Sequence, residues 1–205
     1  MKKIIIAITM LAFGTVSSHA IDIDRSAFSL TAGIAANQGV FGASATETNL
    51  TETNTAGHVK KESGVFTDSY ASSFVELGIG ELLSLGYEHT PDSVTTPTNT
   101  TREDHANENN VKVDFNDLDT IYVKLNLPFA SGMYLKAGTV STDVDITESG
   151  SARTYKNVST DGTTFGVGYS KFLGDSPVGL RIEGNYLELD NVSTDNGISA
   201  TGGNQ

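Results

Sequence analysis

The amino-acid sequence predicts an all-β fold, an antiparallel up-and-down β-barrel, and two observations carry this prediction. First, apolar residues recur at every second position in short segments along most of the chain, as in strands with one apolar face. Second, the connectors between these segments are alternately long and short. This alternation is typical of a chain whose successive antiparallel strands are joined by short turns at one end of the sheet and by longer loops at the other.

Composition narrows the classes of protein that fit. The chain has 205 residues, enough for one domain or two small ones. It has no Cys, which excludes a disulfide scaffold, a Cys-based zinc site and a thiol nucleophile. Its 13 Lys and Arg against 25 Asp and Glu give a net charge of −12, which argues against nucleic acid as a partner. The hydrophobic share of 38% is too low for a helical membrane protein.

Residues 1–20 have the pattern of an export signal peptide. Lys2 and Lys3 precede an apolar stretch over residues 4–14, and a polar run follows. Ser18 and Ala20 are the small residues that predict cleavage after Ala20. The apolar stretch is shorter than the roughly 20 residues that span a bilayer, and a buried N-terminal helix is the alternative. Cleavage would remove both lysines, so the net charge of −12 would become −14.

Six segments of the remaining chain show the alternation clearly, and a seventh shows it weakly. The apolar positions of the six are, in chain order, Phe28, Leu30, Ala32, Ile34 and Ala36; Leu83, Leu85 and Tyr87; Ile121, Val123, Leu125 and Leu127; Met133, Leu135 and Ala137; Phe165, Val167 and Tyr169; and Val178, Leu180 and Ile182. The weak segment covers residues 69–77, with Ala71, Val75 and Leu77 on the apolar face and Phe74 and Glu76 on the other. The sequence therefore predicts seven strands within residues 21–190.

The connectors between these strands fall into two groups. The long ones are polar and cover residues 44–67, 91–116 and 145–162, whereas the short ones cover residues 78–81, 128–132 and 173–176. The fold of a soluble β-sandwich does not require long and short connectors to alternate. A transmembrane barrel has this alternation, with short turns on one side of the membrane and longer loops on the other. Tyr and Phe near the predicted strand ends, including Tyr70 and Tyr134, would then form girdles at the two interfaces.

The composition of the face opposite the apolar one indicates whether the apolar face lies inside or outside the barrel. A soluble barrel turns its apolar face inward, whereas a membrane barrel turns it toward lipid. The opposite face here is rich in Gly, Ser and Thr, which suits the crowded interior of a narrow barrel. It also carries charges of both signs, which we expect to meet in that interior: Glu88, Lys124, Lys136, Arg181 and Glu183. They could form a plug that blocks or gates a passage, or pair as ions that fill the space.

The sequence contains no catalytic constellation that we can defend. The four His residues, His19, His58, His89 and His105, are scattered along the chain. No Gly-rich loop opens a helix, and no Ser lies in a nucleophile elbow. The sequence therefore predicts a protein that is not an enzyme and has no cofactor.

The export signal, the strand pattern and the loop rhythm together resemble the small outer-membrane barrels of Gram-negative bacteria, of the OmpA/OmpX-like or the opacity-type family. The resemblance covers the mature chain as a pattern and rests on no short motif. It implies an eight-stranded barrel in the outer membrane, a monomer in contact with lipid and lipopolysaccharide. Residues 191–205 form a polar tail that resembles an outer loop without a returning strand. We therefore expect the sequence to be truncated before an eighth strand, unless the weak strand is miscounted.

Five aspartates lie beside the fourth and fifth predicted strands, at the end that this topology turns outward. They are Asp114, Asp117 and Asp119 before the fourth strand and Asp143 and Asp145 after the fifth. Because hard cations take oxygen ligands, these carboxylates could hold Ca²⁺ or Mg²⁺ near the lipopolysaccharide headgroups. A solvated acidic rim is the alternative.

The expected function is non-enzymatic, either porin-like or structural in the cell envelope, with long acidic extracellular loops. Two alternatives stay open. The loops could act as a surface adhesin or receptor, or the chain could be a soluble periplasmic barrel with a ligand in an apolar interior.

Overall fold

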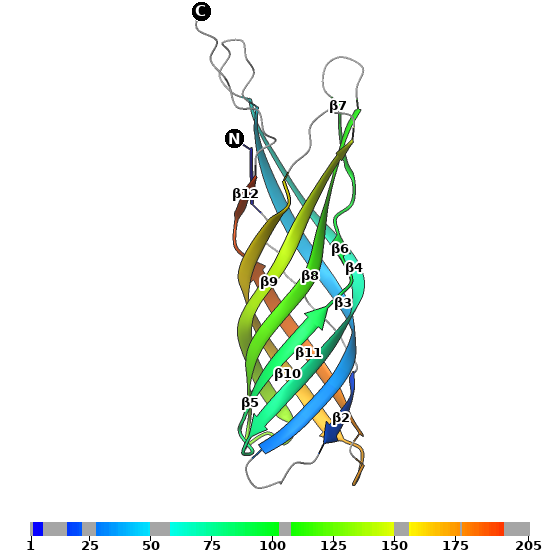
Figure 1. The fold of residues 1–205 in the computed structure, drawn as a ribbon, viewed down its shortest axis with the longest axis vertical. Coiled ribbons are helices and arrows are strands. Elements are labelled where there is room, and N and C mark those ends of the chain that lie inside the picture. The colour runs from blue at the N-terminus through cyan, green and yellow to red at the C-terminus, as the bar shows by residue number, and fades with distance from the viewer. Residues whose placement is uncertain are drawn as a thin grey trace, which may run out of the picture.

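The structure is a computed structural model, which describes residues 2–5, 16–21, 28–49, 58–102, 108–149, 156–176 and 178–194. Every regular element among these residues is a β-strand, which confirms the all-β prediction. All strand pairs are antiparallel, and the sheet curls into a tall, barrel-like tube (Figure 1). No helix in the described part is long and apolar enough to cross a membrane.

The walls of the tube consist of a meander in which each long strand pairs with the next. These strands are β3 (Phe28–Asn49), β4 (His58–Ile79), β5 (Leu83–Thr90), β8 (Glu108–Asn126), β9 (Met133–Ser149), β10 (Val158–Phe172) and β11 (Val178–Leu189). The short strands are β1 (Lys2–Ile5), β2 (Val16–Ile21), β6 (Val94–Thr95), β7 (Asn99–Arg102) and β12 (Val192–Thr194). Each predicted strand falls on one of the long strands.

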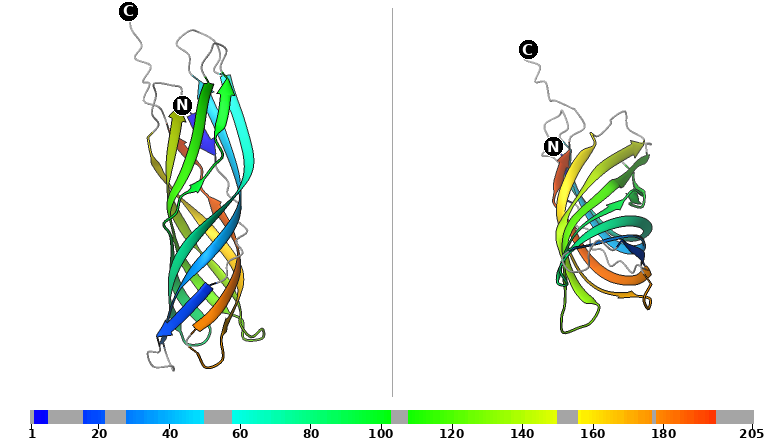
Figure 2. Two further views of the ribbon diagram at one scale, coloured as in Figure 1. Left: turned by 90° about the vertical axis from the view of Figure 1, so that its right-hand side faces the viewer. Right: turned by 60° about the horizontal axis from the view of Figure 1, so that its bottom comes forward.

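The two outer strands of the meander, β11 and β3, meet at a seam that β2 bridges. Residues 16–21 of β2 pair with residues 30–35 of β3, and residues 16–19 also pair with residues 178–181 of β11. The bridge lies low in the tube, near the short turns (Figure 2). Higher up, β1 pairs with both β3 and β12. The strands that cover this seam thus come largely from the predicted signal peptide.

The lower part of the tube, beside the short turns, has a polar interior and an apolar exterior. Its large exposed side chains form a band that we call the apolar belt, made of Phe28, Ile34, Val75, Leu77, Ile79, Leu83, Leu85, Tyr87, Ile121, Val123, Leu125, Phe165, Val167, Tyr169, Leu180, Ile182 and Tyr186. The buried side chains at this level include Glu76, Lys124, Lys136 and Arg181. Because neighbouring residues of a strand point to opposite faces, every strand supplies both sets.

The upper part, toward the ends of the long hairpins, has the reverse arrangement. A buried apolar cluster fills it, the upper core, formed by Phe41, Tyr70, Val94, Val113, Phe115, Leu118, Val140, Val144, Ile146, Leu187 and Leu189. In β9, Lys136 is buried and Ala137 is exposed in the lower part, whereas Val140 is buried and Ser141 is exposed in the upper part. The inward and outward positions keep their alternation, and the apolar residues change sides.

Strand β8 also buries polar residues in the lower part and apolar residues in the upper part, but in this strand a β-bulge produces the change. A β-bulge lies between Asn116 and Asp119, and Asp117 has a φ of 50°. Below the bulge Tyr122 is buried, and above it Phe115 is buried, although one position is even-numbered and the other odd-numbered. The extra residue in the bulge moves the strand by one position, which keeps its apolar residues in the upper core.

The structure corrects two predictions. Most of the described residues in the predicted loops 44–67, 91–116 and 145–162 are strand, because β3, β4, β8, β9 and β10 all extend into them. Several of their apolar residues, such as Phe115 and Ile146, face inward and are spaced among Thr, Asn and Asp, so alternation of apolar residues does not reveal these strands. Tyr70 and Tyr134 are also not interfacial, since they are only 8% and 0% exposed and lie inside the tube.

Candidate functional site: the charged interior of the lower barrel

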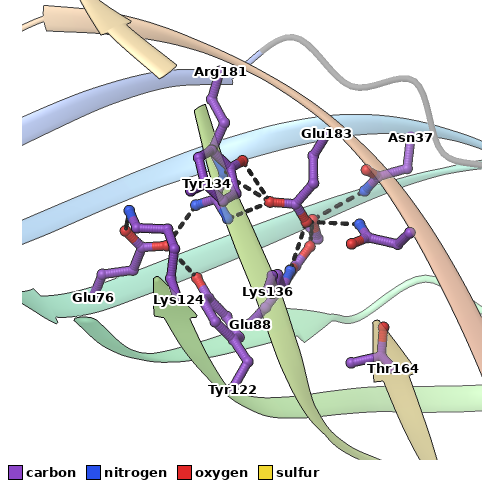
Figure 3. A network of polar contacts seen from close by, with 12 residues as sticks. Asn37, Glu76, Glu88, Tyr122, Lys124, Tyr134, Lys136, Thr164, Arg181 and Glu183 are labelled. Carbon is purple, nitrogen blue, oxygen red and sulfur yellow. Dashed lines mark hydrogen bonds and ion pairs between the residues drawn. The ribbon is translucent and has the colours of Figure 1, made fainter. Parts of the chain in front are cut away.

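Six charged side chains meet inside the lower part of the tube (Figure 3). Three are acidic and three are basic: Glu76 of β4, Glu88 of β5, Lys124 of β8, Lys136 of β9, and Arg181 and Glu183 of β11. None of the six side chains is more than 18% exposed. Each occupies an inward position of its strand, so closure of the sheet brings them together.

Glu76 is the acceptor for one half of this network. Arg181 Nη1 donates to its Oε1 atom at 2.6 Å, and Tyr122 Oη donates to the same oxygen at 2.7 Å. Lys124 Nζ donates to the other oxygen, Oε2. Both carboxylate oxygens are therefore satisfied, and strands β4, β8 and β11 are connected across the interior.

Glu183 is the acceptor for the other half. Its Oε2 atom accepts from both Nε and Nη2 of Arg181 and from Tyr134 Oη, which lies 2.7 Å away. Lys136 Nζ donates to Glu183 Oε1 and to Glu88 Oε2, at 2.7 Å each. Arg181 thus joins the two halves into one continuous network, and Lys136 extends it to Glu88.

Two glycines make room for the tyrosines of the network. A Cβ atom on Gly86 would lie 2.3 Å from the Tyr122 ring, and one on Gly168 would lie 2.1 Å from the Tyr134 ring. The rings in turn lie against cations, with Lys136 Nζ 4.2 Å from the centre of the Tyr122 ring. The inward glycines are therefore part of the packing of the charged interior.

The remaining space in this interior is small. Two cavities of about 20 Å³ each border the network, and Asn37, Glu88 and Asn185 line both. Each has room for about one water molecule. Asn185 Oδ1 is buried and has no hydrogen-bond partner among the described residues, so it is the polar atom that such a water would satisfy. A neutral, hydrogen-bonded network with water-sized gaps can seal a tube against hydrated ions.

The structure brings together all five charged residues that the sequence predicts for the interior. It adds Glu76, which the sequence assigned to the polar face of a weak strand without including it in the cluster, and the two tyrosines. The signal for Glu76 was present, since it lies between Val75 and Leu77, two outward apolar positions. The tyrosines could not be recognised in this way, because Tyr is common on either face of a strand.

The five aspartates of the predicted cation site have separate partners. Asp114 accepts a hydrogen bond from Thr95 and pairs with Lys112, Asp143 accepts from Ser159, Asp145 accepts from Asn116, and Asp119 interacts with Tyr87 and His89. Asp117 lies in the bulge. The described residues contain no group of three or more His, Asp or Glu side chains that could hold a metal ion. The cation hypothesis therefore has no assembled site in this structure.

Comparisons with known proteins give no relative. No protein-family model matches the chain, and neither a search of curated proteins nor a search of solved structures found a match.

Proposed function

We propose that the protein is a transmembrane β-barrel of a bacterial outer membrane, closed by its charged interior, which anchors a raised polar structure on the cell surface. Its role is then structural in the envelope, and it contacts lipid and lipopolysaccharide as a monomer. The cleaved signal peptide and the outer-membrane location belong to the same proposal.

The apolar belt around a charged interior is the observation that carries this proposal. In water, such a surface would expose many large apolar side chains while burying charges, the opposite of a stable soluble protein. In lipid, the same arrangement is favourable. From Phe28 to Ala36, β3 covers about 27 Å along the strand, or about 21 Å along the axis of a barrel with a ~40° strand tilt. Outer-membrane barrels have an apolar band about 25 Å tall.

The eight-strand type is also part of the proposal. Support comes from the seam, where β2 runs antiparallel to both β11 and β3 in the position that an eighth strand would take. Because lipid offers no hydrogen bonds, the backbone groups of β11 and β3 need a partner there. Once the signal peptide is cleaved, a different strand must supply it.

Cysteine labelling tests the membrane location directly, because the native chain has no Cys. We expect single variants in the belt, Val123→Cys and Val167→Cys, to be protected from a water-soluble maleimide in intact cells. The matched variants Ser141→Cys and Asp143→Cys lie on the outer face of the upper part and should react. Equal reaction at all four positions, or recovery of the protein in the soluble periplasm, would contradict the proposal.

Planar-bilayer recording tests whether the barrel is closed. We expect no steady conductance from the refolded protein, because the six charged side chains and two tyrosines fill its interior. A steady conductance that Lys124→Ala alters would instead identify a pore.

A further inference from the structure

Three polar side chains lie in line across the outer face, at the upper edge of the apolar belt. Ser73 of β4 is directly opposite His89 of β5, and His89 is directly opposite Asp119 of β8. His89 Nδ1 is 2.7 Å from Asp119 Oδ1, and Tyr87 Oη donates to the same oxygen at 2.7 Å. Ser73 is exposed, and the side chains of His89 and Asp119 are 35% and 37% exposed. The charged interior does not involve any of these side chains.

The contact with Asp119 fixes the roles of the two ring nitrogens of His89. An ionised carboxylate only accepts hydrogen bonds, so Nδ1 must carry the proton. In the neutral ring, Nε2 is then a proton acceptor. Asp119 lies on one side of His89, and Ser73 lies on the other. Directly opposite side chains have Cβ atoms about 4.5–5.5 Å apart, so the Ser73 hydroxyl is within side-chain reach of the ring. No hydrogen bond joins Ser73 and His89 here, but catalytic hydrogen bonds are often long or poorly aligned until substrate binds.

We propose that Ser73, His89 and Asp119 form a nucleophilic site that hydrolyses carboxylic esters of membrane lipids. Ser73 and His89 would be the catalytic residues and Asp119 a positioning residue. The surroundings select the substrate class. Ile34 lies directly opposite Ser73, and Val75 and Ile121 lie one outward position below Ser73 and Asp119. An acyl chain can lie along these belt residues with its ester group at the level of Ser73. The lipid assignment rests on the proposed membrane location, and the activity departs from the expectation from the sequence that the protein is not an enzyme.

The reaction needs only the ester and water. Ser73 Oγ attacks the ester carbonyl carbon while its proton passes to His89 Nε2, as in other Ser-His-Asp sites. The bond between the carbonyl carbon and the leaving oxygen breaks, and the proton on His89 passes to that oxygen, which releases the alcohol. Water then gives a proton to His89 and attacks the acyl-serine. Release of the carboxylic acid returns the proton to Ser73.

A fluorophosphonate probe tests the nucleophile without requiring lipid. We expect the protein refolded in detergent to form an adduct that mass spectrometry locates on Ser73. Ser73→Ala should abolish the adduct, and His89→Gln should slow its formation about 100-fold. Asp119→Asn should also slow labelling, and Asp119→Glu should restore part of the rate. Ser141→Ala is the matched control, because Ser141 is exposed and lies opposite Asp119 on its other side.

Two results would overturn the proposal: no adduct on the folded wild-type protein, or an adduct that persists in Ser73→Ala. A purely structural role for His89 and Asp119 would produce the first result, even with the Cys variants protected in the membrane. For the substrate class, we expect release of fatty acid from phospholipid in mixed micelles, lost in Ser73→Ala. Hydrolysis of a short nitrophenyl ester without release of fatty acid would overturn the lipid assignment.

Discussion

The lower and upper parts of the tube share the same strands, yet they bury opposite kinds of side chain. Lys136 and Val140 are both inward residues of β9, and both are at most 2% exposed. The lower part combines a buried ionic network with an apolar exterior, whereas the upper part combines an apolar core with a polar exterior. One continuous sheet can therefore be matched to two solvents along its length, with lipid around one part and water around the other.

The comparison also shows where each part obtains its stability. In the upper part, burial of apolar side chains away from water is the main favourable term. In the lower part, the proposed lipid surroundings would remove that advantage, and the interior depends on complete pairing of charges whose desolvation is costly. The upper part should therefore respond to changes in volume and polarity, and the lower part to the loss of a single charge.

The largest effect is expected from Glu76→Gln in the lower interior. The change keeps the shape of the side chain but removes its charge. Lys124 then has no ion-pair partner among the described residues, and Arg181 loses its ion pair with Glu76. Removal of one member of a buried ion pair costs about 3–5 kcal/mol. Urea unfolding in lipid vesicles, followed by circular dichroism, measures the loss. Glu188→Gln is the control on the outer face of β11, and a similar loss there would show that burial is not the cause.

Val123→Arg tests the outer face of the lower part. If the apolar belt faces lipid as proposed, we expect this arginine to cost about 2–4 kcal/mol, the cost of an arginine that faces the middle of a bilayer. Ser141→Arg puts the same side chain on the outer face of the upper part, where an exposed substitution costs within about 0.5 kcal/mol. Equal losses of unfolding free energy for the two variants would remove the distinction between a lipid-facing and a water-facing exterior.

Val144→Thr tests the upper core with a change of nearly constant volume. The new hydroxyl group is buried where Val144 is 0% exposed, at a cost of about 1–3 kcal/mol. Val65→Thr is the control, since Val65 is 76% exposed on the outer face of the upper part. We expect a measurable shift of the urea midpoint for the first variant alone. If Val144→Thr is neutral, the interior of the upper part is wet.

The smallest effect is expected at the boundary between the two parts. Tyr87→Phe removes the hydrogen bond from the Tyr87 hydroxyl to Asp119, which is worth about 0.5–1.5 kcal/mol. Tyr169→Phe removes a hydroxyl from the same belt, for which no partner is found among the described residues. A larger loss of unfolding free energy for the Tyr87 variant in the same assay would confirm that the contact between Tyr87 and Asp119 stabilises the junction of β5 and β8.

The sequence was informative about one part and misleading about the other, for a physical reason. Alternation of large apolar residues such as Ile121, Val123 and Leu125 identified the strands of the lower part and the charges between them. In the upper part most outward residues are polar, and the inward apolar residues, such as Val140 and Ile146, stand among polar ones, so the sequence of these strands resembled that of a loop. The pairing of Glu76 with Lys124 and Arg181 depends on strand register, which a single sequence does not reveal.

The bulge in β8 has a consequence for how this chain can change. Asp117 adds one residue to β8 that β9 does not match, so the two sides of the bulge follow different odd–even frames. Segments above it can be exchanged, lengthened or shortened in pairs of residues without altering which side chains of the apolar belt face outward. Deletion of one residue there would invert the upper half of the strand, and a compensating insertion nearby would restore it. The bulge is thus a natural joint for grafting a foreign hairpin onto the barrel.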